Sequence, residues 1–102
     1  MLDKVIEKDV VQYLSQIRLL LFLEKSEIKT GKVMSVVEKM PSFEREIIIR
    51  KYLAREAEYT SHQTIYKELG ISTGTYKKYR MRGLTKLAAE LGIISVGKEN
   101  EA

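Results

Sequence analysis

Cysteine is missing from this chain of 102 residues, so the protein cannot form a disulfide, a thiolate zinc site or a cysteine nucleophile. The composition therefore favours a reducing, cytoplasmic location. Histidine occurs once, at His62, and the neighbouring sequence offers it no metal-ligating or catalytic partner. A glycine-rich phosphate loop is also lacking, and the glutamates within residues 44–58 do not imply a buried pair. We therefore expect no enzyme activity, no metal and no cofactor.

Long apolar runs are missing as well. The longest, residues 19–23, has the sequence Leu-Leu-Leu-Phe-Leu, whereas a helix that spans a membrane needs about 20 apolar residues. We expect this run to belong to a core or an interface, and we expect neither a membrane span nor a signal peptide. The sequence also contains no internal repeat and no low-complexity segment.

The chain does have ample apolar content and an uneven distribution of positive charge. Hydrophobic residues make up 44% of the sequence, which is enough for the core of one domain. The formal net charge is +4. Residues 1–50 carry nine basic and eight acidic side chains, and residues 51–102 carry nine and six. The positive excess thus lies in the second half, which is typical of a local face for a polyanion.

Residues 2–24 are predicted to form a first helix, because they contain neither glycine nor proline and their apolar residues recur at steps of three and four. Near residues 19–23 the stripe widens until almost every position is apolar. Two interpretations remain open: the helix is the central core element, or part of it pairs with a second copy or another protein. The stripe consists of Ile6, Val10, Tyr13, Ile17 and Leu20, with Val5, Leu14 and Leu21 beside it.

The next two helices are less regular. Thr30 and Gly31 interrupt the pattern of residues 26–40, so we expect only a short second helix there, ending before Pro41. Proline followed by a hydroxyl and by acidic residues is a typical helix start, so Pro41 is predicted to open a third helix. That helix should end between residues 54 and 56.

Residues 62–69 and 73–91 are predicted to form a fourth and a fifth helix, separated by a tight turn. The residues after the fifth helix, through Val96, are expected to fold back as a short strap, followed by a frayed tail at 97–102. Polar caps and terminal glycines set the boundaries of both helices: Ser61 or Thr60, Gly70, Ser72 and Gly92.

The pair of helices around Gly70 has the pattern of a helix-turn-helix, a motif in which the second helix enters DNA. Between Ile71 and Ala89 the sequence has five basic residues and no acidic one. A recognition helix needs a capped start, small residues that let it sit deep, and donors for bases and phosphates. The candidate DNA-binding residues are Ser72, Thr73, Gly74, Thr75, Lys77, Lys78, Arg80, Arg82 and Lys86.

These candidates are expected to have different roles. Ser72 caps the helix, and Gly74 has no side chain to hold the backbone away from DNA. Tyr76 and either Tyr79 or Arg80 are expected on the inner face of the fifth helix. We expect the first of two groups to approach base edges, namely Thr73, Thr75 and Lys78. The second group is expected to hold phosphates, namely Lys77, Arg82 and Lys86.

Several segments carry a resemblance to known families. Residues 69–77 (LGISTGTYK) with Gly83-Leu84, and residues 40–46 upstream, resemble the fourth region of bacterial sigma factors. The chain resembles the ArpU family of phage transcriptional regulators over roughly residues 37–96. Gly83 stands where alanine is usual, which is expected to weaken the helix by up to ~1 kcal/mol. The segments that carry the ArpU resemblance are 50–53 (RKYL), 65–72 (IYKELGIS), 75–77 (TYK) and 87–93 (LAAELGI).

The sequence therefore predicts an all-α fold of about five helices with a C-terminal helix-turn-helix. Within one compact domain we distinguish a helical scaffold (1–40), a DNA-binding region (41–96) and a flexible tail (97–102). The predicted function is sequence-specific binding of double-stranded DNA as a transcriptional regulator. The resemblances imply a phage or prophage regulator of late genes and contact with RNA polymerase. Two alternative functions remain open: a polymerase-binding adaptor without DNA specificity, and a DNA-packaging protein. The first helix is also a candidate contact for a homodimer.

Overall fold

The structure is a computed structural model that describes residues 3–23 and 28–93. This part of the chain is all-helical, as predicted, with five α-helices and no strand. None of its helices is long and apolar enough to cross a membrane. The α-helices are α1 (Lys4–Phe22), α2 (Ile28–Glu38), α3 (Ser42–Ile48), α4 (His62–Leu69) and α5 (Thr73–Leu91).

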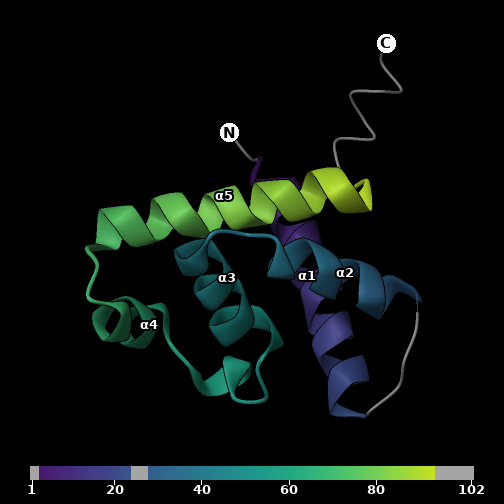
Figure 1. Ribbon diagram of the computed structural model, residues 1–102, viewed down its shortest axis with the longest axis horizontal. Helices are drawn as coiled ribbons and strands as arrows, with labels where there is room; N and C mark the ends of the chain where they lie inside the picture. Colours follow the sequence, from purple (N-terminus) through teal and green to yellow (C-terminus); the bar gives the residue numbers. More distant parts are fainter. Residues whose placement is uncertain (1–2, 24–27, 94–102) are drawn as a thin grey trace.

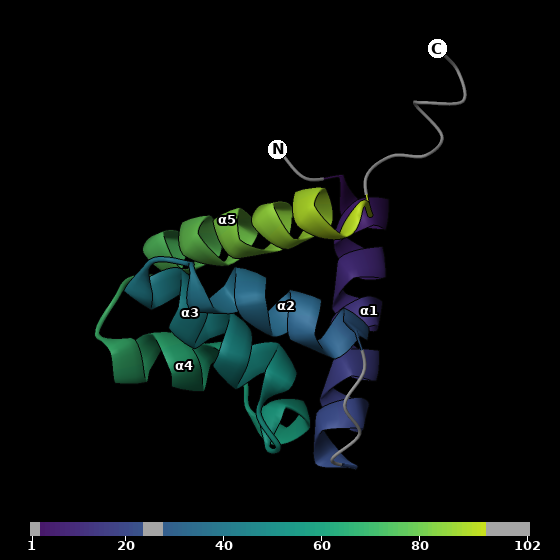
Figure 2. The same cartoon turned by 45° about the vertical axis from the view of Figure 1, so that its right-hand side comes forward.

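Helix α5 lies across the other helices (Figures 1 and 2). It packs on α3, α2 and α1 along its length, while α4 lies under the end at which α5 begins. At Gly83 α5 lies close to α3: an added Cβ would lie 2.8 Å from Cγ1 of Ile48. An alanine at this position would therefore force Ile48 or α5 to shift.

Most of the predicted stripe of α1 lies in the core. Val10, Leu14 and Ile17 are fully buried, in one cluster with side chains from α2 and the later half of α5. Leu19 and Phe22, by contrast, remain more than half exposed. The core interpretation of the first helix is thus correct for its middle, and its C-terminal end keeps exposed apolar surface.

Helix α2 is longer than predicted, because it continues through Thr30 and Gly31. Thr30, Val33 and Val37 are spaced by three and four residues and are all buried. The packing of this face against the core offsets the low helix propensity of threonine and glycine. The prediction of an interruption at these two residues was therefore wrong.

The third helix is followed directly by a π-helical segment, Ile49–Leu53, so the helical run ends before Ala54. Its first residue follows Pro41 as predicted, although no side chain caps it. A short 3-10 turn, Ala57–Tyr59, then leads toward α4. The π-helical segment contacts α1 and brings Tyr52 and Leu53 into the core.

The predicted boundaries of α4 and α5 are confirmed. Ser61, rather than Thr60, caps α4, and Ser72 caps α5. Gly70 and Gly92 have φ angles of 69° and 71°, in the left-handed region that ends helices. Ile93 packs against the core, whereas the rest of the predicted strap and the tail lie outside the described residues.

Candidate nucleic-acid interface

The turn between α4 and α5 is built by local hydrogen bonds. Gly70 ends α4 in the left-handed conformation, and the Ile71 N–H then donates to the Tyr66 carbonyl at 3.1 Å. The Ser72 hydroxyl accepts from the Thr75 N–H at 3.1 Å and lies 2.9 Å from the Thr75 hydroxyl. The start of α5 is therefore fixed relative to α4 by its own sequence.

Longer-range contacts hold α4 in place. Ile65 is fully buried with Ile47 and Tyr76, so one small core joins α3, α4 and α5. Arg50 also bridges two helices: it donates to Glu46 at 3.1 Å and to Glu68 of α4 at 2.6 Å. These contacts make the α4–turn–α5 unit a fixed part of the domain.

The first turns of α5 present an exposed basic surface. Thr73, Gly74, Lys77, Lys78 and Arg82 are all exposed. Among the described residues, Lys77 and Lys78 form no ion pair. A Cβ added at Gly74 would meet nothing within 4 Å, so the protein's own packing does not require glycine at this position. The structure thus keeps this cation-bearing end of α5 open to a partner.

Two further candidates have partners of their own. Arg82 lies with its guanidinium carbon 5.8 Å from the centre of the Tyr79 ring, a cation–π distance. Thr75 is half-buried, and both its N–H and its hydroxyl contact Ser72. Thr75 therefore belongs to the cap of α5, and its hydroxyl is less free to contact a base than we expected.

Arg80 differs most from its predicted role. Its side chain is only 16% exposed; Nε donates to the Tyr52 hydroxyl at 2.6 Å and Nη2 to Glu7 at 2.9 Å. Burial alone would lower the pKa of Arg80, but the contacts with Tyr52 and Glu7 outweigh it and raise the pKa. Arg80 therefore joins α5 to α1 and the π-helical segment and is not a free cation on the exposed basic surface of α5. Its position four residues from buried Tyr76 was the signal for this inward orientation.

Lys86 is tied to the protein as well. Its Nζ lies 2.5 Å from Oε1 of Glu44, whose side chain is only 3% exposed. A buried carboxylate was not expected here, because Glu44 has the position of an ordinary first-turn acid of α3. Glu44 is buried alone among these glutamates: Glu46 is half-buried, and Glu56 and Glu58 are exposed. Lys86 itself is 46% exposed and still reaches the surface.

His62 lies in the first turn of α4, as predicted, but it also has a specific partner. Its Nδ1 is 2.6 Å from the hydroxyl of Tyr76, whose ring is buried as expected. Burial, together with the charges of Arg80 and Lys51, lowers the pKa of His62. Burial also raises the pKa of Tyr76 to about 12, so its hydroxyl stays protonated at neutral pH. This contact connects α4 to α5.

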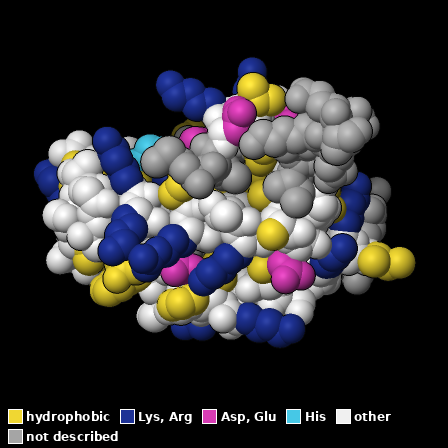
Figure 3. Space-filling view, turned by 90° about the horizontal axis from the view of Figure 1, so that it is seen from above, with side chains coloured by type: hydrophobic (Ala, Val, Ile, Leu, Met, Phe, Trp, Pro, Cys, Tyr) yellow, Lys and Arg dark blue, Asp and Glu magenta, His cyan; other side chains and the backbone are white. Residues whose placement is uncertain are grey.

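The surface over α5 is predominantly basic. In Figure 3, which looks down on this helix, Lys and Arg side chains lie along the molecule and gather over the half in which α5 begins. Across the residues that the structure describes, no group of three or more acidic, histidine or cysteine side chains could hold a metal ion. The candidate interface therefore offers cations and hydroxyls, which suit phosphate and base-edge acceptors.

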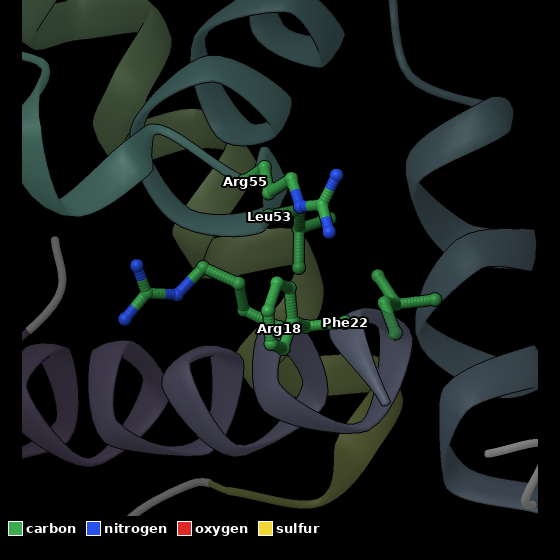
Figure 4. A pocket seen from close by; sticks show the side chains of 5 residues that line it. Arg18, Phe22, Leu53 and Arg55 are labelled. Atoms are coloured by element: carbon green, nitrogen blue, oxygen red, sulfur yellow. The ribbon is translucent and has the colours of Figure 1, made fainter. Parts of the chain in front are cut away.

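A second feature lies at the C-terminal end of α1. Arg18, Leu21, Phe22, Leu53 and Arg55 line an open groove of about 340 Å³ (Figure 4). The guanidinium carbon of Arg55 is 4.7 Å from the centre of the Phe22 ring. The groove is thus lined by apolar side chains and two guanidinium groups.

Comparison of the chain with protein-family models, with curated proteins and with solved structures gave no match.

Proposed function

We propose that the protein is a sequence-specific DNA-binding regulator of transcription, in which α4 and α5 form a helix-turn-helix and α5 is the recognition helix. One observation carries the proposal: the capped start of α5 exposes Thr73, Gly74, Lys77 and Lys78 with no carboxylate between Ile71 and Ala89. Small residues at this end allow close approach, and the two lysines, which form no ion pair among the described residues, supply donors for bases and phosphates.

The assignment of roles follows from how each candidate is held. Lys78 and Thr73 are proposed to approach base edges, and Lys77 and Arg82 to hold phosphates, since all four are exposed. Arg80 is left out because it is engaged with Tyr52 and Glu7. The resemblance to ArpU proteins and to sigma region four extends the proposal to a phage or prophage regulator of late genes that acts near RNA polymerase.

A titration with duplexes selected from a random pool tests the proposal. The triple variant Lys77→Ala, Lys78→Ala and Arg82→Ala should bind more weakly, and the slope of log affinity against log salt should fall by about 0.9 for each lost phosphate contact. All three side chains are exposed, so the thermal unfolding midpoint should change little. Unchanged DNA affinity in this variant would show that α5 is not the recognition helix.

A second candidate function is an adaptor that binds RNA polymerase without DNA specificity. It is favoured by the exposed Leu19, Phe22 and Leu23 at the end of α1, beside the groove of Figure 4. If the protein is such an adaptor, the wild-type chain should bind polymerase in a pull-down and should bind no DNA at low salt. The variant Phe22→Glu should then lose polymerase binding. Mass measurement of the same variant tests the homodimer, because a dimer formed through α1 would become a folded monomer.

A further inference from the structure

Helices α2 and α5 enclose a second basic surface that the sequence did not single out. An open groove of about 340 Å³ lies between them, lined by lysines from both helices. Figures 1 and 2 show α2 under the later half of α5, far along the helix from its capped start. The residues that line the groove are Lys32, Ser35, Val36, Lys39, Met40, Lys86 and Glu90.

The charges of this groove favour an anion. Lys32 and Lys39 are exposed and form no ion pair within the described part of the chain. Lys86 is already paired with Glu44, and Glu90 is the one carboxylate among the lining residues. Among the described lining residues, Lys32 in α2 and Lys39 just after it are therefore the cations left to hold a partner, and the Ser35 hydroxyl can donate beside them.

The distance along α5 indicates what this anion would be if α5 enters DNA. Lys86 follows Lys78 by eight residues, which is about 12 Å of helix. The major groove is also about 12 Å wide. When the start of α5 sits in that groove, the region near Lys86 reaches its edge, where the phosphates of the backbone lie.

The opposite flank of α5 is a poor alternative for the backbone. There the start of α1 carries Lys4 and Lys8 beside Arg80, which is paired with Glu7. Residues 3–9 contain two lysines and three acids, whereas residues 28–39 contain three lysines and one acid. Lys29 has a contact of its own; without it the net charges are −1 on the α1 flank and +1 on the α2 flank, so a phosphate strand is attracted more toward α2.

We propose that the α2–α5 groove is a backbone subsite, in which Lys32 and Lys39 hold phosphates of the DNA strand beside the one read by the start of α5. This inference rests on the proposed DNA binding and extends it from one helix to a surface of two. Its contacts would add affinity and fix the orientation of the protein, and they would carry no base preference.

The test compares two double variants on one mixed-sequence duplex of about 30 base pairs, the length scale of a footprinted site. Lys32→Gln with Lys39→Gln removes the proposed contacts. Lys4→Gln with Lys8→Gln removes the same charge from the α1 flank and serves as the matched control. Glutamine keeps most of each side-chain stem, and all four lysines are exposed, so both variants should fold.

In a salt titration the α2 variant should lose up to about 1.8 from the slope of log affinity against log salt, and the control should lose little. Equal losses in both variants would show a general field effect and overturn the subsite. An unchanged α2 variant, beside a Lys77→Ala and Lys78→Ala variant that loses affinity, would overturn the subsite and leave the proposed function intact. Absence of DNA binding by the wild-type chain at low salt would overturn both.

Discussion

Gly83 provides the sharpest test of how α5 is seated on the core. In Gly83→Ala the new Cβ would lie 2.8 Å from Cγ1 and 3.1 Å from Cδ1 of Ile48. Carbon atoms normally pack at about 3.5–4.0 Å, so the nearest contact is short by about 0.7 Å. Ile48 is fully buried and cannot move into solvent. Either the side chain or the whole of α5 must therefore shift.

The expected magnitude follows from two opposing terms. Alanine in place of glycine stabilises a helix interior by up to about 1 kcal/mol. Overpacking of a filled core costs about 1–3 kcal/mol. The free energy of unfolding of Gly83→Ala should thus fall by up to about 2 kcal/mol, a large part of the stability of a small domain.

A matched control is available in α2. Gly31 is also inside a helix, but a Cβ at this position meets nothing within 4 Å. Gly31→Ala should therefore gain up to about 1 kcal/mol, and the two variants should differ by about 1–3 kcal/mol in urea unfolding. Equal stabilisation by both substitutions would refute the close approach of α5 to α3.

A double-mutant cycle isolates the contact itself. Ile48→Ala alone leaves a cavity and should cost about 2–5 kcal/mol. It also removes both atoms that the new Cβ would meet, so Gly83→Ala should then be neutral or stabilising in that background. A coupling energy near zero between positions 83 and 48 would place the cost elsewhere.

Two further predictions concern the polar contacts under α5. Glu44→Gln removes the negative charge that pairs with Lys86. Because Lys86 is 46% exposed and can be hydrated, the free energy of unfolding should fall by only about 1–2 kcal/mol. The affinity for DNA should not change. A loss of affinity would mean that the pair positions the interface. His62 has a lowered pKa in the folded state, so the unfolded chain binds the proton first as pH falls below about 6.5. Stability should therefore decline with falling pH from that point toward the folded pKa, less steeply in His62→Gln; identical pH profiles in urea unfolding would contradict this.

Local sequence determined the part of the molecule around the candidate interface. The cap residues Ser61 and Ser72 and the left-handed glycines Gly70 and Gly92 satisfy helix ends through neighbours a few residues away. Such signals do not depend on the rest of the fold, so the boundaries of α4 and α5 could be predicted. The exposed lysines at the start of α5 could also be predicted, because helical periodicity alone separates them from buried Tyr76.

Tertiary structure decided the features whose partners are distant in the chain. Arg80 was among the candidate DNA contacts until Glu7, 73 residues away, and Tyr52 were seen to hold it inward. Lys86 likewise pairs with a residue distant in the chain, the buried Glu44. Helix α2 runs through Gly31 because a core formed by other helices covers its apolar face. The groove lysines near α2 lie close to α5 for the same reason. Packing between helices brings together residues that are far apart in the sequence, and no local sequence pattern predicts such neighbours.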